Sequence, residues 1–221
     1  MPVRSHKPSL SLVQLKSEAS RFSEIESAVD SPLLYGVTDG KAVGTYLEHK
    51  FQAQLKEKYT LEVGNSASGI DLPDLGTDIK VTSIRQPQSS CPFTSPRQKI
   101  FGLGYSLLLF VYDKKDDPKR KTARLSILHT IFIASTLTAD FQMTRTLRSM
   151  LAGGTTEEEI VAYFSDRNLP VDEIEAKRLA SEVLKRKPAQ GYLTISNALQ
   201  WRLQYGRVVQ NVAKVKGLFR L

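Results

Sequence analysis

The chain has 221 residues, enough for one domain with a substantial core, and its 41% hydrophobic and 24% charged residues are ordinary for a globular protein. A single cysteine, Cys91, excludes an internal disulfide and a cysteine-rich zinc site, and three scattered histidines argue against a histidine-based metal site. No apolar run is long enough to span a bilayer and the N-terminus lacks the apolar region of a signal peptide, so we expect a cytoplasmic protein that makes no membrane contact.

The net charge of +8 is concentrated at the C-terminal end of the chain. No acidic residue follows Glu182, whereas the same segment holds eight basic residues, Lys185, Arg186, Lys187, Arg202, Arg207, Lys214, Lys216 and Arg220. Aromatic residues are interleaved with them: Tyr192, Trp201, Tyr205 and Phe219. This pattern predicts an electrostatic contact surface for nucleic acid, with a solvated basic surface or an anionic membrane contact as the alternatives.

Two helices are predicted in the first sixty residues. Apolar residues recur at helical spacing through residues 11–29. In residues 41–57 a second helix is expected to follow the Asp39-Gly40 turn, and its buried stripe steps by four, through Val43, Leu47, Phe51 and Leu55. Glu48 flanks that stripe. By itself, this position is typical of an exposed helix carboxylate.

Residues 69–83 are the most informative stretch of the chain. Asp78 and Lys80 alternate with Ile79 and Val81, which is the period of a half-buried strand. We expect the two apolar residues to face a core and the two charged residues to lie together on the opposite face.

A second carboxylate precedes this strand. Asp71 lies seven residues before Asp78, across the turn signals Pro73 and Gly76, so a chain that doubles back there brings the two carboxylates together. Two converging carboxylates suit a hard cation such as Mg²⁺, and the adjacent Lys80 can orient or deprotonate a water. These are the parts needed for metal-assisted phosphodiester hydrolysis. The alternative is a surface hairpin with an ordinary ion pair.

The rest of the chain predicts a sheet followed by helices. Residues 85–98 are expected to form an irregular loop, residues 105–112 a buried central strand, residues 113–121 a charged turn and residues 122–135 a further strand. Helices are predicted at residues 139–151, 155–166 and 171–186, and a short strand at residues 191–194. Asn197 is expected to cap a last helix that carries Leu199, Trp201, Leu203 and Tyr205.

The stretch from Asp71 to Lys80 resembles the active-site hairpin of the PD-(D/E)XK nucleases. Within them it is similar to the MutH-like branch, which includes the mismatch-repair nicking endonuclease MutH and related type II restriction enzymes. The segment Asp-Leu-Gly-Thr-Asp-Ile-Lys at residues 74–80 is similar to that branch's Leu-Gly-x-Glu-Leu-Lys, with Asp78 in place of glutamate. Residues 40–48 resemble the helix before the catalytic hairpin, and Glu48 occupies the place of a supporting glutamate.

Two further matches to this branch lie downstream. Lys99 matches a lysine that precedes the next core strand. Tyr192-Leu193 matches an aromatic-Tyr-Leu segment that approaches DNA, although the residues after Leu193 depart from the pattern. The resemblance covers residues 40–112 well and the C-terminal segment poorly.

The resemblance implies an α/β, restriction-endonuclease-like fold: a mixed central sheet flanked by helices, with a helical, basic C-terminal region. It implies one endonuclease domain over residues 1–221, with a catalytic core at about 40–135 and a helical, DNA-contacting part at about 136–221. It also implies Mg²⁺-dependent cleavage of double-stranded DNA that leaves a 5′-phosphate and a 3′-hydroxyl.

Site roles follow from the same resemblance. Asp71 and Asp78 would hold the metal, Lys80 would orient the attacking water, Glu48 would support a metal or the lysine, and Lys99 would lie near the phosphate. From the basic segment and the Tyr192 match, we expect DNA contacts from Lys185, Arg186, Lys187, Tyr192, Arg202, Arg207 and Lys214.

A type II restriction enzyme is favoured over a repair nickase, because outside the catalytic segments the chain departs widely from MutH. A MutH-type nicking endonuclease and a non-catalytic DNA-binding protein with a structural acidic hairpin are the alternatives. The branch often recognises GATC, which is an expectation here by analogy alone. A palindromic target would imply a homodimer.

Overall fold

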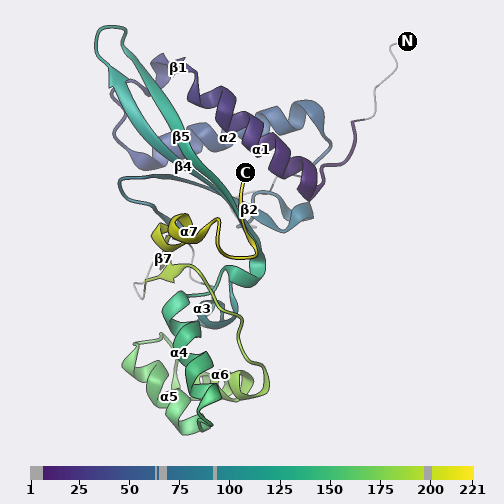
Figure 1. Ribbon diagram of the computed structural model, residues 1–221, viewed down its shortest axis with the longest axis vertical. Helices are drawn as coiled ribbons and strands as arrows, with labels where there is room; N and C mark the ends of the chain where they lie inside the picture. Colours follow the sequence, from purple (N-terminus) through teal and green to yellow (C-terminus); the bar gives the residue numbers. More distant parts are fainter. Residues whose placement is uncertain (1–6, 63, 65–68, 92–93, 197–200) are drawn as a thin grey trace. The chain divides into compact units, whose positions relative to one another are not determined.

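The computed structural model describes residues 7–62, 64, 69–91, 94–196 and 201–221. The chain divides into two compact units (Figure 1). Unit 1 comprises Met1–Pro87, Leu107–Phe132 and Phe219–Leu221, and unit 2 comprises Gln88–Ser106 and Ile133–Leu218.

Unit 1 begins with the two predicted helices, and both are confirmed. Helix α1, Leu12–Ser27, starts at a capping box in which Ser11 and Gln14 bond each other's backbone N–H groups. Helix α2, Gly40–Lys58, starts at Asp39, whose carboxylate accepts a hydrogen bond from the Lys41 backbone N–H at 2.9 Å. The short 3₁₀ helix η1, Pro32–Leu34, lies between them.

A five-stranded sheet accompanies these helices. Its order is β1–β5–β4–β2, with β8 also paired to β5. The strands are β1 (Asp30–Ser31), β2 (Thr77–Ser83), β4 (Ser106–Asp117), β5 (Thr122–Ile133) and β8 (Leu218–Arg220), and the 3₁₀ helix η2 (Pro73–Leu75) precedes β2. The helices together with the sheet confirm the predicted α/β class, a mixed sheet flanked by helices.

The prediction of a charged turn over residues 113–121 was wrong. Strand β4 continues to Asp117, and the turn occupies only residues 118–121. Charges are tolerated in this end of the strand because it is solvated, and Lys114 pairs there with Asp116.

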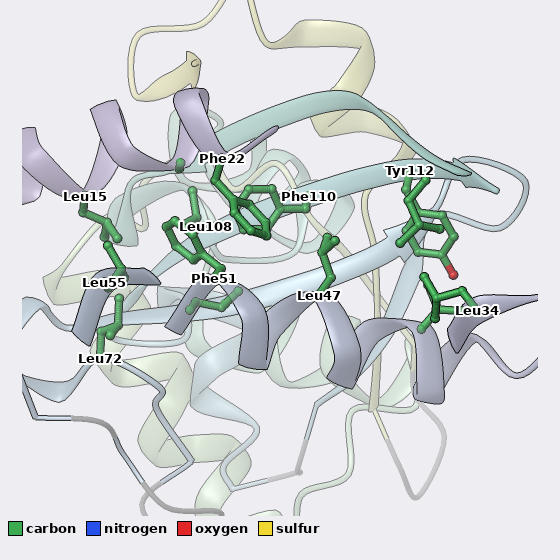
Figure 2. Packing of buried hydrophobic residues seen from close by; sticks show 14 of the residues in the cluster. Leu15, Phe22, Leu34, Leu47, Phe51, Leu55, Leu72, Leu108, Phe110 and Tyr112 are labelled. Atoms are coloured by element: carbon green, nitrogen blue, oxygen red, sulfur yellow. The ribbon is translucent and has the colours of Figure 1, made fainter. Parts of the chain in front are cut away.

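The core of unit 1 lies between the two helices and the sheet. Leu15 and Phe22 of α1 and Phe51 of α2 meet Leu108 and Phe110 of β4 (Figure 2). The rings of Phe22, Phe51 and Phe110 contact one another, with centroids 5.0, 5.3 and 5.8 Å apart. Such aromatic contacts add to the stabilisation gained from burying apolar area, so this triad fixes α2 on the sheet.

Replacing Phe51 by alanine is expected to lower the free energy of unfolding by about 3–5 kcal/mol, because the ring is fully buried and its loss leaves a cavity. Urea denaturation followed by far-UV circular dichroism measures the change. Leu33→Ala is the matched control, since Leu33 is 77% exposed. Equal midpoints for the two variants would contradict this account of the core.

Unit 2 combines a helical group with a small sheet. Its helices are α3 (Arg97–Phe101), α4 (Phe141–Ala152), α5 (Glu157–Asp166), α6 (Glu173–Lys185) and α7 (Gly206–Asn211), with the 3₁₀ helix η3 at Ser135–Leu137. The predicted helices at 139–151, 155–166 and 171–186 are thereby confirmed to within a few residues. The antiparallel sheet has the order β3–β7–β6, from Gln88–Cys91, Trp201–Gln204 and Thr194–Ile195.

Two predictions for unit 2 were wrong. Residues 85–98 are not simply an irregular loop, because they contain β3 and the start of α3. Trp201–Gln204 is a strand rather than part of a helix, because Trp201 and Leu203 alternate with polar residues at a period of two. Asn197 and Leu199, which completed the predicted helix, lie outside the described residues.

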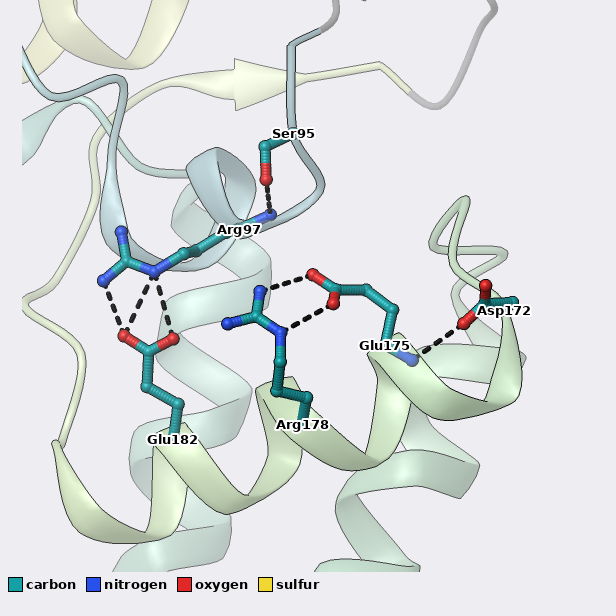
Figure 3. A network of polar contacts seen from close by, with 6 residues as sticks. All are labelled: Ser95, Arg97, Asp172, Glu175, Arg178 and Glu182. Carbon is teal, nitrogen blue, oxygen red and sulfur yellow. Dashed lines mark hydrogen bonds and ion pairs between the residues drawn. The ribbon is translucent and has the colours of Figure 1, made fainter.

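A charged contact fixes α3 to α6. The Arg97 guanidinium donates from Nε to Oε2 of Glu182 at 3.0 Å and from Nη2 to Oε1 at 2.5 Å (Figure 3). A bidentate contact of this kind restricts both position and angle, so it orients the short helix α3 against the longer one. Of the helices that the described residues form, none has the length and apolarity needed to cross a membrane.

Candidate active site

A tight turn brings Asp71 back alongside Asp78. Gly76 adopts φ +50°, a left-handed conformation that favours glycine, and two backbone hydrogen bonds of 3.0 and 3.1 Å join Leu72 and Thr77 across the turn. The Asp71 carboxylate then accepts a hydrogen bond of 2.8 Å from the backbone N–H of Ile79. The turn signals at Pro73 and Gly76 therefore produce the convergence that the sequence predicts.

Strand β2 places Asp78 and Lys80 on the same face, as predicted. The Lys80 Nζ lies 2.7 Å from an oxygen of Asp78. Ile79 points into the core and is 1% exposed, but Asp78 is also buried, at 3% exposed. The strand is therefore covered on both faces at this point, and the carboxylate is removed from water.

Glu48 reaches the same place from α2, which packs on β2. A Cβ added to Gly44 would lie 3.8 Å from the Cβ of Val81, so the two backbones run close together. Glu48 follows Gly44 by one helical turn and is half-buried. Its carboxylate lies 3.5 Å from the side-chain amide of Gln52, a buried residue one turn further on. Gln52 was not among the predicted site residues, although its four-residue spacing from Glu48 indicates a shared helix face.

The electrostatics of the site show that the three carboxylates interact. Burial raises the pKa of Glu48 to about 7, assisted by the charge of Asp71 and a hydrogen bond with it. Burial also raises the pKa of Asp78 to about 7, assisted by a hydrogen bond with Asp71. The ammonium of Lys80 opposes both increases. The structure therefore brings together Glu48, Asp71, Asp78 and Lys80, four of the five predicted catalytic residues.

This donor set fits a divalent cation without enclosing one. No three or more His, Cys, Asp or Glu side chains within the described ranges form a ready-made metal site. The pKa shifts nevertheless show that Glu48, Asp71 and Asp78 lie within electrostatic and hydrogen-bonding reach of one another. Neighbouring buried carboxylates need either protons or a cation to offset their charges. Mg²⁺ prefers oxygen ligands, retains several waters and takes only one or two carboxylates, so an open group suits it.

Lys99, the fifth predicted residue, belongs to α3 in unit 2. It is 5% exposed, and burial lowers the pKa of its ammonium while the charge of Asp140 opposes that effect. The Lys99 backbone carbonyl accepts a 3.0 Å hydrogen bond from the Asp140 N–H. The Asp140 carboxylate itself accepts from the backbone N–H groups of Met143 and Ile195, both at 2.8 Å. Lys99 therefore lies in a structural junction between α3, α4 and β6.

The predicted DNA-contacting residues all lie in unit 2. Five of them are exposed: Lys185, Arg186, Lys187, Arg202 and Lys214. The other two are half-buried against one ring. The Arg207 guanidinium lies 3.8 Å from the centroid of Phe141, and the ring of Tyr192 packs edge-on to it at 5.7 Å. The exposed group presents positive charge to solvent, whereas Arg207 and Tyr192 are held by packing.

Comparisons with known proteins agree with the prediction of a restriction enzyme. The family model described as "Type II restriction enzyme NspV" matches residues 9–220. The chain is 62% identical over 209 residues to the type II restriction enzyme NspV of Nostoc sp. (strain ATCC 29411 / PCC 7524), a match that covers 95% of each chain. No solved structure matches it. Both units are included in the family match, and the protein therefore belongs to the NspV family of type II restriction enzymes.

Proposed function

We propose that Glu48, Asp71, Asp78 and Lys80 form the active site with which this restriction enzyme hydrolyses phosphodiester bonds of double-stranded DNA at a specific sequence. The observation that supports the assignment is the convergence of three carboxylates on a lysine, with the pKa values of Glu48 and Asp78 raised to about 7. Strongly perturbed carboxylates beside a specific cationic partner are typical of functional sites.

Asp71 and Asp78 would hold a magnesium ion, with Glu48 supporting the ion or the lysine. When bound, the ion supplies positive charge that stabilises the negative charge developing on the phosphate. Asp71 is held in place by the Ile79 N–H, and Glu48 by the amide of Gln52. These contacts keep the carboxylates converged before any substrate arrives, which reduces the reorganisation needed for catalysis.

Lys80 would orient the attacking water. Its ammonium lies 2.7 Å from Asp78 and its side chain is 20% exposed, so the lysine lies beside the carboxylates at the solvent-accessible edge of the site. The Asp71, Asp78 and Lys80 spacing on a hairpin, beside a helix that carries Glu48, supports membership of the PD-(D/E)XK nucleases and their MutH-like branch. The proposal has three further parts. Lys99 would lie near the phosphate, the enzyme would act as a homodimer on a palindromic target, and it would be located in the cytoplasm.

The test is cleavage of supercoiled plasmid DNA. With Mg²⁺ we expect discrete linear fragments. With a chelator we expect intact plasmid, because no cation then offsets the charge on the phosphate. With Ca²⁺ we also expect intact plasmid, because this larger ion binds oxygen ligands at longer distances and in looser geometry than Mg²⁺. Sequencing the fragment ends gives the recognition site and the cut position. Persistent nicked circles without linear product would instead favour the MutH-type nicking activity, and no cleavage with Mg²⁺, Mn²⁺ or Co²⁺ would contradict the proposed chemistry.

A further inference from the structure

The small sheet of unit 2 has two chemically different faces. Side chains alternate between the faces of a strand, and one face of the β3–β7–β6 sheet is apolar and buried, carrying Cys91, Ile195, Trp201 and Leu203. The opposite face carries only polar side chains, which we call the reading face: Gln88, Ser90, Thr194, Arg202 and Gln204.

The strand register arranges the reading face in two rows. Gln204 on the central strand lies between Gln88 and Thr194, and Arg202 lies beside Ser90. Arg202 and Gln204 are exposed, and no carboxylate pairs with Arg202 within the described part of the chain. The guanidinium and the amide on the central strand therefore project into solvent with their donors available to a ligand.

The buried face makes this platform rigid. Trp201, Leu203 and Tyr205 have no solvent exposure, and the Tyr205 hydroxyl lies 2.5 Å from the hydroxyl of Ser89 on β3. A side chain on a packed strand keeps its direction better than one on a loop, and recognition of a specific partner requires that precision.

The charge around the sheet favours a polyanion. Its strands come from the two longest stretches of the chain that contain no acidic residue, residues 79–112 and 183–221. These stretches meet when β3 pairs with β7, so the sheet has no negative charge of its own and is flanked in sequence by basic residues. A surface of this kind attracts polyanions such as DNA and repels basic proteins.

The polar groups of the reading face match base edges. In the major groove, arginine pairs bidentately with guanine, glutamine pairs with adenine, and serine or threonine bonds to either. The major groove, about 12 Å wide, admits a two-stranded β-ribbon, and the pair β3–β7 carries four of the five residues of the reading face. Phosphate binding alone would favour lysine or arginine throughout, whereas this face carries two glutamines and two hydroxyls.

We infer that the reading face contacts base edges in the major groove of double-stranded DNA, with Arg202 and Gln204 as the principal specificity-determining residues. The inference rests on the proposed endonuclease function, because it assigns the surface by which that enzyme selects its sequence. Arg202 was predicted to contact DNA, but from a helix and not from a strand, and Gln88 and Gln204 were not among the predicted site residues.

The test is selection of bound duplexes from a random-sequence pool in the presence of Ca²⁺, followed by sequencing. The wild-type protein should enrich one motif. Arg202→Lys keeps the charge but loses the bidentate donor, so it should retain affinity for random duplex while its preference for a guanine falls about tenfold to hundredfold. Gln204→Ala should reduce preference at a neighbouring position, and Gln204→Thr, which suits a strand better, should do the same if the alanine variant folds poorly.

Arg145→Ala and Gln142→Ala are the matched controls, because both residues are exposed on α4 in the same unit, and the wild-type motif should survive in each. A motif unchanged in both Arg202→Lys and Gln204→Ala would overturn the inference. The inference would also be overturned if the wild-type protein enriched no motif, or if both variants bound all duplex sequences more weakly by the same factor. Plasmid cleavage with Mg²⁺ is measured separately. If the active-site assignment fails, cleavage results change while the selected motif stays the same, so the two failures can be distinguished.

Discussion

Asp78→Asn should reduce the cleavage rate by about a thousandfold or more, because it removes a proposed ligand of the metal ion. A loss of that size corresponds to an increase of about 4 kcal/mol in the activation free energy. Binding to the recognition sequence in Ca²⁺ should remain measurable. The measurement is a single-turnover rate on a duplex that contains the recognition site. Asp74→Asn is the matched control on the same hairpin, since Asp74 is exposed and its carboxylate accepts a hydrogen bond of 3.2 Å from the Glu62 backbone N–H, away from Asp78 and Lys80.

The same substitution should preserve or raise stability in the absence of metal. Burial raises the pKa of Asp78 above its value in the unfolded chain, so the folded state binds more protons between the two pKa values. Stability therefore increases as pH falls from about 8 towards 5, and asparagine, which is always neutral, removes the cost of the buried charge at high pH. A thermal midpoint at pH 8 well below that of the wild type, or a wild-type cleavage rate, would refute the assignment.

Lys80→Ala should reduce the single-turnover rate by about a hundredfold or more, because it removes the group that we propose positions the attacking water. The loss should be accompanied by a shift in pH dependence. The ammonium opposes the raised pKa values of Glu48 and Asp78, so without it both carboxyls stay protonated to higher pH. The residual activity should therefore need a more alkaline solution than the wild-type activity does.

Lys41→Ala is the matched control for this second experiment, because Lys41 is an exposed lysine at the start of the same helix that carries Glu48. It should retain the wild-type rate and pH profile. A Lys80→Ala enzyme with the wild-type rate would assign Lys80 to a structural ion pair with Asp78, and a reduced rate with an unchanged pH profile would contradict the electrostatic account.

The convergence of Glu48, Asp71, Asp78 and Lys80 was predictable because its determinants are local. Pro73 and Gly76 specify the turn that returns Asp71 to Asp78, and the four-residue steps of α2 specify which face of the helix meets the sheet. What the local pattern did not reveal is the burial of Asp78. A strand with alternating apolar and polar residues indicates one solvent-exposed face. At Asp78, however, elements distant in sequence cover both faces of the strand.

The small sheet was missed for a related reason. Gln88–Cys91 has no apolar alternation of its own, and only its pairing with Trp201–Gln204 makes it a strand. That pairing joins residues more than a hundred positions apart, which periodicity within a short window cannot detect. For Trp201–Gln204, two signals disagreed: Asn197 resembled a helix cap, whereas the alternation of apolar and polar residues indicated a strand. Pairing with β3 and β6 stabilises the strand.

The register of β3 against β7 has a consequence for how such enzymes diverge. The four proposed catalytic side chains come from one continuous segment, residues 48–80. The reading face instead combines partners from two distant segments, Gln88 with Gln204 and Ser90 with Arg202. Relatives that recognise other sequences should therefore differ at both members of a pair together, and a chimera that exchanges only one strand should lose its old target without acquiring a new one.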